Sequence, residues 1–175
     1  LPLDKTILLF VADNLDRRLK GLNILLETLR KYFSDCKDIL LLTIGRKNID
    51  FRLEGIEVLS LGYLNDENSL NDVYSAADVF ITPSLAESFG NTVLESTLCG
   101  TPVIGFPVGG VKEQIINVIN GILCNEISDK SLAEAINKFL KHKDIFDKEK
   151  IRKSSVEKYN LRKYALRYLE VYKDL

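Results

Sequence analysis

The sequence contains no methionine, no tryptophan and a single histidine. Because a start methionine is missing, we expect the 175 residues to be a fragment cut from a longer chain. The single histidine, His142, falls in a basic stretch and is expected at the surface. The three cysteines, Cys36, Cys99 and Cys124, are widely spaced, odd in number and form no C-x-x-C pair, so neither a disulfide framework nor a zinc site is indicated. We expect three buried thiols in a reducing compartment.

Other missing patterns argue against whole classes of function. The sequence contains neither the G-x-G-x-x-G order of a dinucleotide site nor the G-x-x-x-x-G-K-[ST] order of a phosphate loop. Their absence argues against a dehydrogenase and against an ATPase. No apolar run approaches the length that spans a membrane. The net charge of −1 gives no reason to expect nucleic-acid binding.

The charge is unevenly distributed along the chain. Residues 1–140 hold 13 basic and 19 acidic residues (13 − 19 = −6), and residues 141–175 hold 11 basic and 6 acidic residues (11 − 6 = +5). The basic tail is typical of a solvated helix face, and contact with an anionic membrane surface or an acidic partner is the alternative. We expect a cytoplasmic protein, with the inner face of the membrane as the alternative location.

Apolar runs alternate with helical patterns from end to end. This order predicts an α/β fold, a Rossmann-like doubly wound parallel sheet of about six strands followed by C-terminal helices. No linker divides the chain, so we expect one domain over residues 1–175. Asp129 or Ser131 is expected to cap the helix at 131–140. The predicted strands are 6–11, 39–44, 58–61, 79–82, 102–106 and 121–123, and the predicted helices are 22–33, 70–77, 91–98, 111–118, 131–140, 146–159 and 161–172.

Residues 83–95, P-S-L-A-E-S-F-G-N-T-V-L-E, join a predicted strand to a helix. Glu87 precedes the helix and Glu95 lies in its second turn, so both can face a cleft at the end of the strand. Carboxylates accept hydrogen bonds from paired hydroxyls, which suits a sugar or a ribose. The backbone amides of residues 89–92 suit an anion such as a diphosphate. Spacing alone also fits a solvated Glu87 and a Glu95 favoured by the helix dipole.

Two further loops follow strand ends. Residues 105–113, G-F-P-V-G-G-V-K-E, could accept an anion at Gly109 and Gly110, although glycine pairs mostly mark turns. Residues 13–21, D-N-L-D-R-R-L-K-G, carry three cations that could neutralise a diphosphate, or could form a solvated charged turn. Those cations are Arg17, Arg18 and Lys20.

Taken together and in this order, these motifs resemble one family. They are similar to the C-terminal nucleotide-sugar-binding domain of the retaining glycosyltransferases with two Rossmann-like domains, the GT-B architecture (glycosyl transferases group 1). The resemblance runs from about residue 6 to residue 140. The matching segments are Lys20-Gly21, L-G-Y-L at 61–64, A-D-V-F-I-T-P-S at 77–84, E-S-F-G-N-T-V-L-E at 87–95, C-G-T-P-V-I at 99–104 and G-G-V-K-E at 109–113.

The resemblance implies a role for individual residues. Glu87 would contact hydroxyls of the transferred sugar, and Glu95 would hold the ribose hydroxyls. Lys20 would bind the diphosphate. The family's usual arginine falls at Leu15 here, so Arg17 and Arg18 together would take its place. The remaining expected donor contacts are Ser88, Phe89, Gly90, Asn91 and Thr92 along the sugar and phosphates, Gly109 and Gly110 beside them, and Gly45 and Leu64 at the nucleobase.

The resemblance also implies an activity. A sugar would pass from a nucleotide-diphospho-sugar to an acceptor hydroxyl with retention, in polysaccharide, lipopolysaccharide or glycolipid synthesis. The family's acceptor site lies in an N-terminal domain that is absent here, so we expect this fragment to be inactive. No cofactor or metal is expected, because the D-x-D motif of metal-dependent transferases is missing.

The sequence leaves two alternatives open. A sugar-nucleotide epimerase of related fold would require a histidine in the cleft, and a non-catalytic nucleotide-sugar-binding module would bind without turnover.

The last helix resembles one that crosses to the other domain in this family. Its tyrosines, Tyr164, Tyr168 and Tyr172, would then be exposed, or they pack on this domain's own core.

Overall fold

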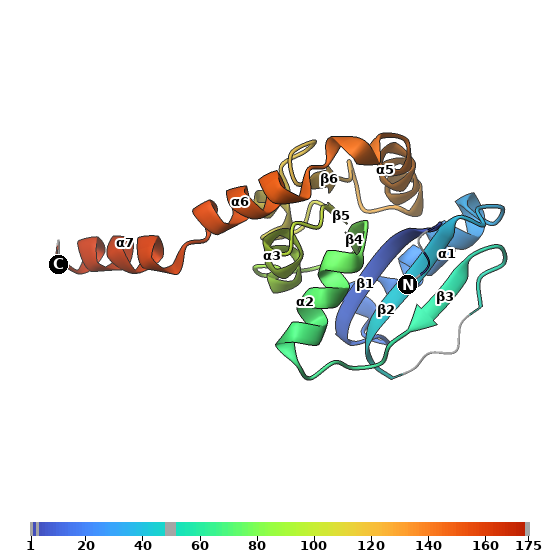
Figure 1. Cartoon of the computed structure of the whole chain (residues 1–175), viewed down its shortest axis with the longest axis horizontal. Coiled ribbons are helices and arrows are strands. Elements are labelled where there is room, and N and C mark those ends of the chain that lie inside the picture. The colour runs from blue at the N-terminus through green and yellow to red at the C-terminus, as the bar shows by residue number, and fades with distance from the viewer. Residues whose placement is uncertain (1, 3, 48–51, 174–175) are drawn as a thin grey trace.

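The computed structural model describes residues 2, 4–47 and 52–173 of the chain. Six strands and seven α-helices alternate through most of it (Figure 1). The strands are β1 (Thr6–Asn14), β2 (Ile39–Arg46), β3 (Glu57–Ser60), β4 (Val79–Thr82), β5 (Val103–Gly105) and β6 (Gly121–Leu123). The helices are α1 (Leu22–Tyr32), α2 (Glu67–Ala76), α3 (Asn91–Leu98), α4 (Val111–Gln114), α5 (Asp129–His142), α6 (Lys148–Lys158) and α7 (Leu161–Lys173), with 3-10 turns η1 (Arg18–Lys20) and η2 (Lys143–Ile145).

The strands form one parallel sheet in the order β3-β2-β1-β4-β5-β6. The order reverses direction between β1 and β4, and the helices that follow these two strands, α1 and α3, pack on opposite faces of the sheet. In such folds ligands bind at the carboxyl ends of the strands at this point. The doubly wound fold predicted from the sequence is therefore confirmed. Its topological switch point directs attention to the loops after β1 and β4.

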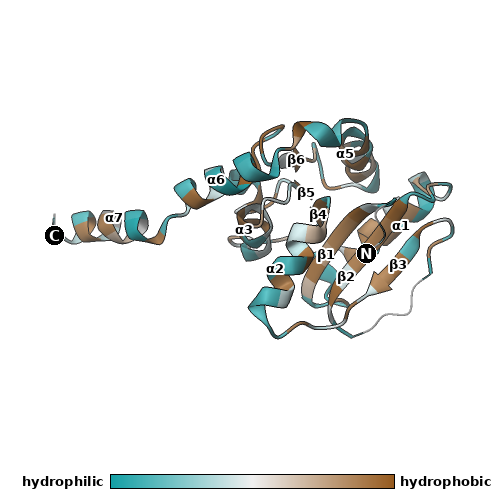
Figure 2. Ribbon diagram, in the orientation of Figure 1, coloured by the Kyte–Doolittle hydropathy of each residue, from teal (hydrophilic) through white to brown (hydrophobic). Residues whose placement is uncertain are grey.

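Side chains alternate between the two faces of the sheet, and each face has its own core. Strand residues such as Leu8, Leu41 and Ile104 pack against α1 and α5. Their neighbours, such as Leu9, Leu42 and Val103, pack against the α2 side. The central strands are apolar along most of their length (Figure 2), as expected of a sheet covered on both faces.

The outer edge of β6 is closed by the segment before it. The Val118 amide donates to the Gly121 carbonyl at 3.0 Å, and the Leu123 amide donates to Asn117 Oδ1 at 2.7 Å. Asn120 Oδ1 accepts from the Ile116 amide at 2.7 Å. These bonds draw residues 115–120 out of a helix, so the predicted helix at 111–118 is wrong beyond Gln114.

Three other sequence expectations need correction. The cap of α5 is neither Asp129 nor Ser131, because the Ser128 side chain accepts from the Ser131 amide at 3.0 Å and the Ser128 backbone is extended. The expected helix at 146–159 begins only at Lys148, after the η2 turn. Of the cysteines, only Cys124 is buried, whereas Cys36 and Cys99 are partly exposed.

The last two helices differ in how they meet the main body. Helix α6 packs on α3, and Lys148 Nζ donates to the Ala77 carbonyl at the end of α2 at 3.0 Å. Helix α7 extends away from the sheet (Figure 1), and its Tyr168 and Tyr172 are exposed. The side chain of Tyr164 lies outside the described residues. None of the helices in the described part of the chain is long and apolar enough to cross a membrane.

Candidate functional site

The loops after β1 and β4 are joined to one another at the switch point. The Leu85 amide donates to the Leu19 carbonyl at 2.9 Å. Gly21 has a left-handed backbone (φ +77°), and a Cβ atom there would lie 1.9 Å from the Pro83 carbonyl oxygen. Only glycine permits this approach, so the Lys20-Gly21 pair fixes one loop against the other.

Lys20 and Glu87 meet across this junction. Lys20 Nζ lies 2.8 Å from Glu87 Oε2, and the two side chains are only 21% and 18% exposed. The pair borders a cavity of about 380 Å³. This cavity is lined by Arg17, Leu19, Lys20, Ala86, Glu87 and Ser88.

A second cavity of about 230 Å³ continues from the same ion pair to the start of α3. Gly90 is the N-cap of that helix and has a left-handed backbone (φ +88°), so the chain changes direction here as it enters α3. The first backbone amides of a helix have no partner within it and carry partial positive charge. The cavity therefore combines a cation, a carboxylate and free amides. Its lining residues are Lys20, Glu87, Ser88, Phe89, Gly90, Asn91 and Thr92.

The glycine pair after β5 supports the loop from behind. A Cβ atom on Gly109 would lie 1.6 Å from the Glu87 carbonyl oxygen, and one on Gly110 would lie 2.3 Å from that of Phe89. The Gly110 amide donates to the Ser88 carbonyl at 3.1 Å, and Gln114 Nε2 donates to the Phe89 carbonyl. Neither glycine is among the described residues that line the two cavities. In this structure they position the loop that carries Glu87.

Glu95 contacts a different partner from the Lys20–Glu87 pair. Its Oε2 accepts a hydrogen bond from the hydroxyl of Tyr74 on α2 at 3.0 Å, and it is not among the described residues lining either cavity. Burial and the nearby Glu95 carboxylate raise the pKa of Tyr74 well above its ordinary value. The bond holds the Glu95 carboxylate between α2 and α3. Sequence reasoning missed Tyr74, although a buried tyrosine normally requires a hydroxyl partner.

The remaining predicted residues are spread along the strand ends. Arg17 lines the larger cavity and lies 3.7 Å from Asp13, whereas Arg18 is exposed and outside the described lining. Gly45 is buried at the end of β2 against Leu15. Leu64, after β3, is half-buried and packs on the α2 face of the sheet. The structure thus places Arg17 with Lys20 and Glu87, and leaves Arg18, Gly45 and Leu64 outside that group.

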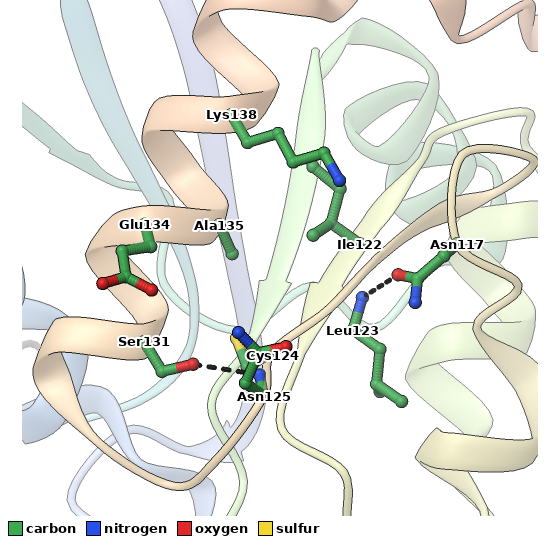
Figure 3. Close-up of a pocket in the computed structure, with 9 residues that line it drawn as sticks. All are labelled: Asn117, Ile122, Leu123, Cys124, Asn125, Ser131, Glu134, Ala135 and Lys138. Atoms are coloured by element: carbon green, nitrogen blue, oxygen red, sulfur yellow. Dashed lines mark hydrogen bonds between the residues drawn. The ribbon is translucent and has the colours of Figure 1, made fainter.

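A separate cavity of about 270 Å³ lies between the end of β6 and α5 (Figure 3). Two hydrogen bonds join polar groups of its lining: the Asn125 amide donates to Ser131 Oγ at 3.0 Å, and the Leu123 amide donates to Asn117 Oδ1 at 2.7 Å. Burial raises the pKa of the Cys124 thiol to about 12. The two charged lining residues, Glu134 and Lys138, are exposed and opposite in sign. This arrangement does not favour an anion, and none of the predicted site residues lies there.

Comparison with known proteins identifies a family for most of the chain. Residues 5–142 match the family described as glycosyl transferases group 1. An uncharacterised glycosyltransferase of Methanocaldococcus jannaschii is 35% identical over 121 residues, which are 67% of this chain and 30% of that protein. The chain therefore spans less than a third of this relative's length.

Two solved structures share the fold over nearly the whole chain. Sucrose-phosphate synthase of Thermosynechococcus elongatus superposes with a TM-score of 0.81 at 26% identity, over 99% of this chain and 46% of that one. HepE of Anabaena, solved with UDP and glucose, superposes with a TM-score of 0.76 at 20% identity, over 98% of this chain and 49% of that one. In both cases this chain matches about half of the larger protein.

Proposed function

Because the chain belongs to the glycosyl transferases group 1 family, we propose that its crevice binds a nucleotide-diphospho-sugar for a retaining sugar transfer. The observation that carries the proposal is the contact between Lys20 and Glu87 at the topological switch point, beside the start of α3. A cation and helix amides suit the diphosphate, and a carboxylate suits sugar hydroxyls. HepE, which shares the fold, was solved with UDP and glucose, which makes UDP-sugars the first donors to try.

The proposed reaction breaks the bond between the sugar and the diphosphate, so negative charge builds on the leaving group. Lys20, Arg17 and the amides of Asn91 and Thr92 would stabilise that charge from one side of the crevice. Removing one such contact typically lowers the rate by about 10²–10³. Glu87 would hold the sugar hydroxyls. Glu95 would hold the ribose, with the nucleotide running from the ion pair across the start of α3 toward α2.

We propose that the acceptor site lies outside these 175 residues, in an N-terminal domain of the whole enzyme. The chain spans about half of the solved structures it matches, which supports this division. The acceptor would be a sugar or a lipid-linked sugar in polysaccharide, lipopolysaccharide or glycolipid synthesis. The reaction would take place in the cytoplasm or at the inner face of the membrane, without a metal or other cofactor.

Calorimetric titration of this chain with UDP-, GDP- and ADP-sugars tests the proposal. We expect saturable binding of one nucleotide class without turnover. Glu95→Ala should weaken binding of both the nucleotide and the sugar nucleotide, whereas Glu87→Ala should weaken mainly the sugar nucleotide. Equal affinity of wild type and both variants for every donor would contradict the assignment.

An epimerase differs from this proposal in needing a histidine at the sugar. The single histidine, His142, is exposed at the end of α5 and does not line the Lys20–Glu87 cavities. A binding module without catalysis would give the same saturable binding in the calorimetric titration. Turnover on joining this chain to its N-terminal half would distinguish the transferase from the module.

A further inference from the structure

Lys20 and Glu87 are proposed to contact different parts of the donor, yet in this structure they contact each other. The ammonium and the carboxylate are 2.8 Å apart, and about four fifths of each side chain is shielded from solvent. A diphosphate that binds Lys20 must therefore share the ammonium with the Glu87 carboxylate or displace that carboxylate from it. Leaving a shielded carboxylate without its partner is unfavourable.

The surroundings offer Glu87 little compensation for that loss. The other cation lining the cavity, Arg17, is exposed and lies near Asp13. The backbone of Glu87 is fixed from behind by Gly109, whose Cα packs against the Glu87 carbonyl. The backbone beside Lys20 is fixed by Gly21 against Pro83. Neither loop can shift easily to keep the pair together while a diphosphate binds.

We propose that the Lys20–Glu87 ion pair makes Glu87 the residue that distinguishes a nucleoside diphosphate-sugar from the bare nucleoside diphosphate. Hydroxyls of the sugar donate to Glu87 in place of the Lys20 ammonium, which frees Lys20 for the diphosphate. A bare nucleoside diphosphate supplies no such donor and must compete with Glu87 for Lys20. The same competition favours release of the product diphosphate. This inference rests on the proposed function.

Calorimetric titrations of the 175-residue chain with UDP and with UDP-glucose at low ionic strength test it. If UDP-glucose does not bind, the pair GDP and GDP-mannose or the pair ADP and ADP-glucose is used instead. We expect Glu87→Gln to bind UDP about tenfold more tightly, equivalent to about 1.4 kcal/mol, because Lys20 is no longer held by a carboxylate. The same variant should bind UDP-glucose about tenfold less tightly, so the two affinities move in opposite directions.

Two further variants separate this effect from a general change of charge or fold. Glu27→Gln removes the same charge from the exposed face of α1 and should change neither affinity. Lys20→Met should weaken both ligands. Melting temperatures of all variants establish that each is folded.

The outcomes separate the inference from the proposed function. Suppose that wild type binds both ligands but Glu87→Gln binds UDP no better than wild type. The inference that Glu87 distinguishes the two ligands is then wrong, and the proposal of a donor site is unaffected. If wild type binds none of the nucleotides or sugar nucleotides, both the donor site and the discrimination are wrong.

Discussion

Replacing Tyr74 with phenylalanine removes one hydroxyl that joins α2 to α3. The Tyr74 ring is fully buried and packs edge-on against Phe80 with ring centroids 5.6 Å apart. Phenylalanine keeps that packing, so the change isolates the bond from the hydroxyl to Glu95 Oε2. The experiment therefore asks whether this bond holds Glu95 in place for the ribose.

The expected magnitude follows from the surroundings of the bond. A hydrogen bond to a charged group contributes about 1.5–3 kcal/mol. Glu95 is partly exposed, so water can replace the hydroxyl, and we expect the low end, about 1.5 kcal/mol off the free energy of unfolding. A carboxylate released from a fixed position must be ordered again by the ligand, at a cost of about 1 kcal/mol. Nucleotide affinity should therefore fall about fivefold.

Urea unfolding measures the first effect and calorimetric titration with UDP or a UDP-sugar measures the second. Tyr168→Phe removes an exposed hydroxyl from α7 and should change neither quantity. A Tyr74→Phe variant of wild-type affinity but lower stability would show that the hydroxyl only supports packing. Wild-type values for both quantities would refute the reasoning altogether.

Three further predictions concern stability. Gly21→Ala should lower the free energy of unfolding by about 3 kcal/mol in urea unfolding, because a left-handed backbone and a Cβ 1.9 Å from the Pro83 carbonyl oxygen combine strain with a clash. Ser128→Ala should lower it by about 1 kcal/mol through loss of the α5 cap, and Ser128→Asp should restore it. Because the folded pKa of Tyr74 lies above its unfolded value of about 10, its contribution is complete below about pH 10 and is lost as the pH rises further. Wild type should therefore lose stability above about pH 10 more steeply than Tyr74→Phe in pH-dependent thermal unfolding, and parallel profiles would contradict this.

Much of the fold could be predicted because its elements are visible locally. The predicted bounds agree with the observed ones at β4, α3 and β6. Two of these are short apolar runs of buried parallel strands, and the third is the helical pattern at residues 91–98. The end of α4 could not be found in this way. It depends on Asn120, whose side chain accepts the Ile116 amide and also donates to the Gln114 carbonyl.

The same limit applies to the candidate site. Strand-end loops carrying Lys20 and Glu87 can be found from sequence, because parallel strands place their carboxyl ends along one edge. The partner of Glu95 could not be found from sequence, because Tyr74 lies 21 residues away on another helix. The position of Tyr74 in the sequence is that of an ordinary core residue of its helix. The N-cap of α5 is Ser128 and not Asp129 because the backbone of Ser128 is extended. Several neighbouring residues have side chains that could cap a helix, so the sequence does not show which of them has that backbone conformation.

The hydrogen bond from the Leu85 amide to the Leu19 carbonyl has a kinetic consequence for the proposed donor site. Both walls of the crevice are already assembled before any ligand arrives, because one loop is hydrogen-bonded to the other. Binding then requires no slow ordering of a flexible segment. Donors that differ in their sugar should reach the crevice at similar rates and differ mainly in their residence times.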